Sequence, residues 1–208
     1  MTKTFTVASG KHYFKGLKFQ ELFYPILMLV VTFGLSISSF VQSTFVWGGL
    51  GASLILYGFA KWKLLDLEIL ARFSPECLYT LDTNFDQINK LYGLGEGVHH
   101  KDSARFGWRC VDGKSIEIIA YCYVRGERQS RKLMDCSTNE WLKLDLYIEK
   151  GKYVFVGENE DGEKARVSMP RRTGFFFGRL FTYKLFPYFG GSIGAPHQMS
   201  IEVVEKEK

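Results

Sequence analysis

Arginines in the second half of the chain have the chemistry needed to bind an anion. They gather around residues 105–109, 125–132 and 171–179. A planar guanidinium can hold a phosphate through two parallel hydrogen bonds, and neighbouring aromatic rings can stack on the ligand. The alternative is that the arginines lie on solvated surfaces and the tyrosines in the core. We expect a ligand-binding site formed by Arg105, Arg109, Tyr121, Tyr123, Arg125, Arg128 and Arg131.

Histidines offer a second chemistry, metal binding. His99 and His100 precede Asp102, and His197 lies far downstream. Adjacent side chains on an extended segment point to opposite faces, so both histidines can bind one ion only in a bent loop. We expect hydrogen-bonded loop histidines here, with no metal and no cofactor.

Familiar catalytic patterns are missing from the sequence. It has no Ser-His-Asp order with a nucleophile elbow, no phosphate loop and no H-E-x-x-H motif. The cysteines show no C-x-x-C spacing and are expected to be small buried side chains: Cys77, Cys110, Cys122 and Cys136. These absences favour a protein that is not an enzyme.

The net charge of +5 is concentrated near the N-terminus. Residues 1–63 contain six lysines and one glutamate, whereas residues 64–208 contain 21 basic and 21 acidic residues. A domain without net charge has no long-range field to attract a polyanion. The distribution therefore argues against DNA as a partner.

An apolar stretch dominates the N-terminal part of the chain. From Leu22 to Ala60 there are 39 residues without Asp, Glu, Lys, Arg or His. One membrane helix needs about 20 apolar residues, so this length predicts a transmembrane hairpin in the lipid bilayer, 22–60, with helices at about 22–40 and 45–60. Small residues spaced four apart would let hairpins pack closely, and we expect homo-oligomers through Gly48, Gly49, Ala52 and Ser53.

Lysines flank both outer ends of the predicted hairpin, and its turn carries no charge. Because positive flanks stay on the cytoplasmic side, this pattern predicts a multi-pass protein of the inner membrane with both termini cytoplasmic. The expected division is a basic cytoplasmic segment (1–21), the hairpin, a helical connector (61–75) and a cytoplasmic β-rich domain (76–208).

Beyond Cys77 the sequence alternates between apolar and polar residues, with turn signals about every 8 to 12 residues. The alternation predicts strands over 116–124, 140–150, 153–156, 165–169 and 199–204, and residues 86–92 suit a short helix. The expected fold class is a membrane-anchored all-β protein: an N-terminal two-helix transmembrane hairpin followed by a small antiparallel β-barrel or β-sandwich.

Five short stretches of the β-rich part carry a resemblance to a known group of domains. They are Asn89-Lys90-Leu91, His99-His100, Ser103 to Arg109, Phe186 to Gly191 and Ala195-Pro196-His197. Together they resemble bacterial β-rich domains, often found in lipoproteins, whose function is unassigned. The resemblance covers most of residues 77–204. It implies one functional hypothesis, an envelope-associated β-sandwich binding module for carbohydrate or protein partners.

The overall arrangement resembles a second group, the two-transmembrane-helix β-barrel effectors of bacterial CBASS antiphage defence. The likeness lies in the architecture, and no residue is matched. In that family the barrel binds a cyclic nucleotide, and the assembly of the protein that follows damages the inner membrane. The resemblance implies the first functional hypothesis, a membrane-anchored effector whose β domain binds a cyclic nucleotide second messenger and triggers hairpin oligomerisation.

Overall fold

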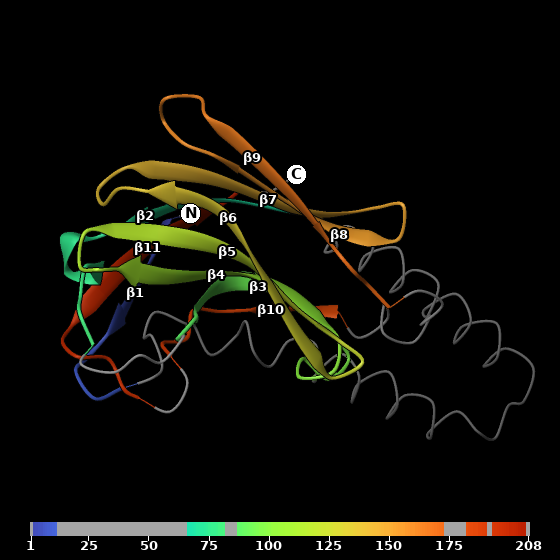
Figure 1. Cartoon of the computed structure of the whole chain (residues 1–208), viewed down its shortest axis with the longest axis horizontal. Helices are drawn as coiled ribbons and strands as arrows, with labels where there is room; N and C mark the ends of the chain where they lie inside the picture. Colours follow the sequence, from blue (N-terminus) through green and yellow to red (C-terminus); the bar gives the residue numbers. More distant parts are fainter. Residues whose placement is uncertain (1, 12–65, 82–86, 173–181, 191–192, 207–208) are drawn as a thin grey trace, which may run out of the picture.

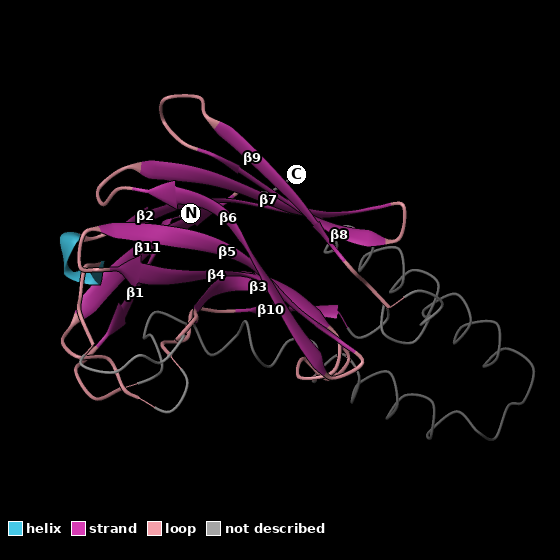
Figure 2. Ribbon diagram, in the orientation of Figure 1, coloured by secondary structure: helices cyan, strands magenta, loops and turns pink. Residues whose placement is uncertain are grey.

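The computed structural model describes residues 2–11, 66–81, 87–172, 182–190 and 193–206. Within these ranges every element is a β-strand except one turn of 3-10 helix, Pro75–Cys77. The strands form two antiparallel sheets that stack on each other (Figures 1 and 2). The described part is therefore a β-sandwich.

One sheet has six strands and the other five. The six-stranded sheet runs, from edge to edge, β1 (Thr2–Val7), β11 (Met199–Glu205), β2 (Leu67–Phe73), β7 (Trp141–Glu149), β8 (Lys152–Glu158) and β9 (Lys164–Met169). The five-stranded sheet runs β10 (Thr182–Leu185), β3 (Asn89–Glu96), β4 (Ser103–Val111), β5 (Ser115–Val124) and β6 (Glu127–Cys136). Because β1 pairs with β11, strands from opposite ends of the chain lie side by side.

Alternation along the strands decides which side chains enter the core. In β7, Leu142, Leu144 and Leu146 are buried, whereas the residues between them are partly exposed. Successive side chains of a strand point to opposite faces, so the leucines face the other sheet. The strands predicted from this alternation, now β5, β7, β8, β9 and β11, are confirmed.

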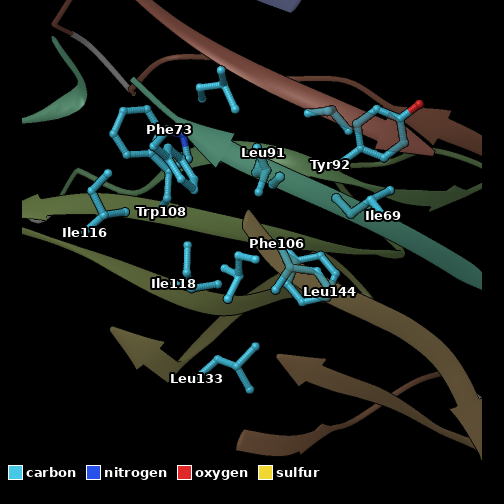
Figure 3. Packing of buried hydrophobic residues seen from close by; sticks show 14 of the residues in the cluster. Ile69, Phe73, Leu91, Tyr92, Phe106, Trp108, Ile116, Ile118, Leu133 and Leu144 are labelled. Atoms are coloured by element: carbon cyan, nitrogen blue, oxygen red, sulfur yellow. The ribbon is translucent and has the colours of Figure 1, made fainter. Parts of the chain in front are cut away.

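Aromatic side chains join the two sheets across the core (Figure 3). The ring of Phe73 in β2 lies 5.3 Å from that of Trp108 in β4. Phe106 of β4 meets Phe155 of β8 edge to face at 5.2 Å. Each such side chain contributes about 1.5–3 kcal/mol through burial, so these contacts hold the five-stranded sheet firmly against the other.

Two helix predictions are wrong. The expected helical connector, 61–75, contains strand β2, in which Leu67, Ile69, Ala71 and Phe73 are buried in alternation. The short apolar run fits the spacing of a helix as well as that of a strand. Pairing with β11 and β7 stabilises the strand. The helix expected over 86–92 is also absent from its described residues 87–92, because β3 begins at Asn89.

The expected fold class, a membrane-anchored protein with an N-terminal two-helix hairpin, is wrong. The strands on either side of the apolar stretch, β1 and β2, belong to one sheet and are separated only by β11. The strands also form two separate sheets instead of one closed barrel.

The expected location, a multi-pass protein of the inner membrane with both termini cytoplasmic, is contradicted as well. None of the helices in the described ranges has the length and apolar character needed to span a membrane. The predicted hairpin itself, 22–60, lies outside the described residues, together with the predicted oligomerisation residues Gly48, Gly49, Ala52 and Ser53.

Candidate ligand-binding face

The outer face of the five-stranded sheet carries a small apolar cluster of its own. Ile88, Ile119 and Tyr121 are buried there, and Tyr123 packs against them. The rings of Tyr121 and Tyr123 lie 5.6 Å apart and nearly perpendicular. This cluster is separate from the core between the sheets. We call this side of the sheet the tyrosine face and define it by Ile88, Lys90, His99, Arg105, Ile119, Tyr121, Tyr123, Arg128 and Tyr183.

Strand register brings these residues together from all five strands. Arg105 in β4 lies opposite Tyr121 of β5 on one side and opposite Gly93 of β3 on the other. Arg128 of β6 lies opposite Tyr123. At the other edge, Tyr183 of β10 lies opposite Gly95 of β3. The face is thus built on paired strands, which hold side chains more rigidly than loops do.

Two glycines in β3 make room for the larger side chains. A Cβ atom added to Gly95 would lie 2.8 Å from the ring of Tyr183. A Cβ atom on Gly93 would lie 2.3 Å from the Cβ atom of Arg105 and from the carbonyl oxygen of Ala104. Real Cβ atoms do not approach other atoms so closely, so both positions need glycine for this arrangement.

Arg105 lies at the centre of the face and is 9% exposed. Its Nε atom is buried and has no hydrogen-bond partner in the described part of the chain. Burial lowers the pKa of Arg105, and the groups that oppose this shift are the phenols of Tyr121, Tyr183 and Tyr123. A guanidinium remains charged in proteins, so this is a buried positive charge beside neutral tyrosines.

Lys90 and Arg128 bring two more positive charges to the same region. The Nζ atom of Lys90 lies 5.0 Å from the centre of the Tyr121 ring and donates to the carbonyl oxygen of Ile88. Burial, and then the charges of Arg105 and Arg128, lower the pKa of Lys90 to about 8. Among the described residues, no carboxylate forms an ion pair with Lys90, Arg105 or Arg128.

Two histidines border the face at the turn after β3. The Nδ1 atom of His99 shares a hydrogen bond of 3.0 Å with the hydroxyl of Tyr183, which also accepts from the backbone N–H of His99. The ring of His100 meets Tyr123 edge to face at 5.9 Å. Burial, followed by His100 and Arg105, lowers the pKa of His99. Neutral polar groups therefore stand beside the cations.

The structure places four of the predicted ligand-binding residues together: Arg105, Tyr121, Tyr123 and Arg128. The others lie elsewhere. Arg109 is farther along β4 and forms an ion pair with Glu117. Arg131 lies opposite Ala120, on the side of β6 that faces away from the tyrosine face.

Arg125 and His197 are also outside this group. Arg125 lies in the turn between β5 and β6 with φ of 55°, and its backbone N–H donates to the carboxylate of Asp102. The Nε2 atom of His197 lies 2.6 Å from the carbonyl oxygen of Glu76, which belongs to the 3-10 helix. His197 therefore lies away from His99 and His100, whose rings are 4.1 Å apart. All four cysteines are free thiols; Cys77, Cys122 and Cys136 are buried, as expected, whereas Cys110 is partly exposed.

Lys90, Tyr183, Gly93 and Gly95 belong to the site, and the sequence reasoning missed them. One signal was available. Residues 93–97, Gly-Leu-Gly-Glu-Gly, have glycine at every second position. This spacing indicates a strand that carries no side chains on one of its two faces. The helix expected over 86–92 would have ended directly before these glycines.

Comparison with known proteins identifies the fold. No family model and no curated protein matches the chain. Among solved structures, the alginate lyase from Klebsiella pneumoniae is similar, with a TM-score of 0.50 and 10% identity over 68% of this chain and 58% of the lyase. A β-1,3-glucanase from Mycobacterium marinum has a TM-score of 0.39 and 12% identity over 68% of this chain and 62% of its own. A xylan β-1,4-xylosidase from Bacillus halodurans C-125 has a TM-score of 0.42 and 11% identity over 68% of this chain and 27% of the xylosidase.

At such low identity the likeness to the lyase establishes a shared fold, a two-sheet β-sandwich. This chain spans less than two thirds of the lyase's length. The expectation that the chain is not an enzyme is corrected, because a protein named as a lyase uses the same fold and the missing motifs do not exclude catalysis on it. Of the two functional hypotheses, the fold favours the β-sandwich module.

Proposed function

We propose that this chain binds carbohydrate on the tyrosine face of its β-sandwich. The observation that carries the proposal is the outer face of a sheet on which the partly exposed rings of Tyr123 and Tyr183 lie beside a small apolar cluster that is separate from the core. Aromatic rings with a few convergent polar groups around them are typical of ligand sites. The polar groups of Tyr183, His99 and Lys90 lie at the border of this cluster.

A sugar ring matches this mixture of groups. Its C–H faces are apolar and pack on aromatic rings, while its hydroxyls need hydrogen-bond partners around the rim. Tyrosine presents both an apolar ring and a polar hydroxyl. Tyr121 is buried at 2% exposure and packs against the ring of Tyr123. Tyr123 and Tyr183 are partly exposed, so these are the two rings that a sugar could touch.

The fold comparison supports the same proposal. The similar structure is named as an alginate lyase, a protein that acts on a polysaccharide by its name. That likeness concerns the fold, and the choice of carbohydrate for this chain rests on the tyrosine face. A concave or flat sheet face with a few convergent polar groups is a common place for a ligand site.

Binding of the purified full-length chain to a panel of neutral and acidic oligosaccharides tests the proposal. Replacing Tyr123 with alanine should weaken binding about tenfold, which corresponds to about 1.4 kcal/mol. The matched control is Trp141→Ala. Trp141 is an aromatic residue on the outer face of the other sheet, where Arg72 lies 4.6 Å over its ring. It should have no effect.

Two results would overturn the proposal. One is a wild-type chain that binds no oligosaccharide in the panel, including the case in which it binds only proteins. The other is an equal loss of binding in Tyr123→Ala and Trp141→Ala, because that would place the sugar away from the tyrosine face.

A further inference from the structure

We infer that Lys90, Arg105 and Arg128 form a subsite for an acidic group, so that the ligand is an acidic glycan bearing uronic acid carboxylates. The inference rests on the proposed function, because it names the class of carbohydrate that the tyrosine face would take. It is carried by three cations that lie together with no carboxylate partner in the described part of the chain.

Arg105 differs from the other buried charged residues in the described part of the sandwich, because each of those has an ion-pair partner. The described charged residues that are buried are Glu96, Asp102, Arg105, Glu117 and Arg171. Glu96 pairs with Arg171, Asp102 with Arg172, and Glu117 with Arg109. Arg105 has phenols as its neighbours, and its buried Nε atom has no hydrogen-bond partner among the described residues. A buried charge is ordinarily paired, so an oxyanion from outside the chain would complete this one.

Repulsion strengthens this argument. Burial lowers the pKa of Lys90, and the positive charges of Arg105 and Arg128 lower it further. Bringing like charges together costs free energy, and a bound anion reverses the sign of that cost for all three. Arg105 offers a planar group with several N–H donors, which suits a carboxylate in two-point contact. The half-buried Lys90 can reach the anion from the neighbouring strand β3, and the exposed Arg128 can reach it from β6, on the far side of β5.

The shape of the face favours a glycan over a nucleotide. The face extends from Tyr183 in β10 to Arg128 in β6, across five strands. Four spacings of about 4.8 Å give a length of about 19 Å. An elongated ligand such as an oligosaccharide fills that length, with one acidic group at Arg105 and sugar rings against Tyr123 and Tyr183. A cyclic nucleotide, the ligand expected from the sequence, shares the negative charge and the flat ring but is more compact.

Calorimetric titration of the full-length chain separates these ligands. The probes are hexasaccharides of mannuronate and of galacturonate, the same hexasaccharides with their carboxyl groups reduced to alcohols, a sulfated oligosaccharide, and a cyclic dinucleotide. The expected result is that at least one uronate binds about tenfold or more tightly than its reduced form.

Three variants locate the subsite. Arg105→Met should abolish the preference for the acidic hexasaccharide, and Arg128→Met should diminish it. The matched control is Arg72→Met on the outer face of the six-stranded sheet, which should keep the preference unchanged. Circular dichroism checks that each variant is folded. If Arg105→Met does not fold, Arg128→Met decides, because that side chain is exposed and its loss leaves the interior intact.

The outcomes distinguish this inference from the proposed function. Equal binding of the acidic and reduced forms would overturn the acidic subsite and leave carbohydrate binding in place. Stronger binding of the sulfated oligosaccharide would overturn the assignment to a carboxylate. Binding of the cyclic dinucleotide alone, or of no probe, would overturn both. A preference for the acidic form that survives in Arg105→Met and Arg128→Met would show that the subsite lies elsewhere.

Discussion

Two buried arginines of this sandwich have opposite surroundings. Arg171, which is 7% exposed, donates to both oxygens of Glu96 at 2.8 and 2.6 Å. The hydroxyl of Tyr153 donates to the same carboxylate at 2.6 Å. Arg105 is 9% exposed, and its Nε atom has no partner among the described residues. Among the residues that the structure describes, Arg171 has a full set of partners and Arg105 does not.

The difference separates a structural role from a binding role. A paired and hydrogen-bonded charge can be buried because its partner replaces the lost water. An unpaired one lowers the stability of the free protein and gains a partner only when a ligand arrives. Proteins retain such unfavourable groups at functional sites, where stability and function oppose each other. Arg171 should therefore matter for folding and Arg105 for binding.

The largest expected effect is on stability. Replacing Arg171 with methionine leaves the carboxylate of Glu96 buried without its partner, and this should lower the free energy of unfolding by about 3–5 kcal/mol. Arg105→Met removes a charge that has no ion-pair partner in the described part of the chain, and it should change the free energy of unfolding by less than about 1 kcal/mol, or increase it. Unfolding in guanidinium chloride measures both. Equal losses in the two variants would break the comparison.

Substituting alanine for Gly93 or Gly95 tests whether the tyrosine face needs the close approach of its neighbours to these two glycines. In Gly93→Ala the added Cβ atom would lie 2.3 Å from the backbone of β4, which cannot move aside, and the expected cost is about 1–3 kcal/mol. In Gly95→Ala the nearest atoms belong to the ring of Tyr183, which can rotate. That variant should fold and lose sugar binding. Thermal unfolding with a binding assay distinguishes the two, and full binding by Gly95→Ala would show that the position of Tyr183 is unimportant.

The third prediction concerns pH. The pKa of Lys90 is lowered from its ordinary 10.5 to about 8, so the side chain is charged below pH 8 and neutral above it. Affinity for an acidic oligosaccharide should therefore fall about tenfold as the pH rises through 8. Tyr121 and Tyr183 stay neutral in this window because burial raises the pKa of both. Lys90→Arg keeps its charge and should give a flat profile in titrations from pH 7 to 9.5; a wild-type profile that is equally flat would exclude Lys90 from the subsite.

The smallest effect is expected on the outer face of the six-stranded sheet. Arg72 and Glu202 form an ion pair of 2.9 Å with side chains 36% and 35% exposed. Such pairs are screened by solvent, so Arg72→Met should cost about 0–1 kcal/mol in calorimetric unfolding and should leave ligand binding unchanged. A loss of binding here would remove the distinction between the two faces.

Sequence alternation predicted strands well where apolar side chains mark one face. Residues 140–150 alternate leucine or isoleucine with polar residues, and β7 follows that pattern. β3 was missed because its outer positions are glycines, which leave no hydrophobic period to detect. β2 was missed because its leucines suit a helix equally well. Pairings such as β1 with β11 join residues from both ends of the chain, and no local pattern contains them.

The site could be predicted by residue type more easily than by position. The arginines indicated a site for an anion, and the tyrosines indicated a surface on which a ligand could stack. Four of the predicted residues do lie together on one face. Arg128 and Arg131 are three apart, so a strand places them on opposite faces, and the sequence already contained this separation. Which face turns outward depends on the second sheet. The lowered pKa of Lys90 comes from its burial and from Arg105 and Arg128, which belong to other strands. The sequence around Lys90 therefore could not predict its place in the site.

The structure of the chain with a bound uronate hexasaccharide tests the central claim most directly. The account predicts the sugar along the outer face of the five-stranded sheet, with one carboxylate within hydrogen-bond distance of the guanidinium group of Arg105 and a sugar ring against Tyr123 or Tyr183. A hexasaccharide bound on the outer face of the six-stranded sheet, or bound with Arg105 still unpartnered, would contradict it.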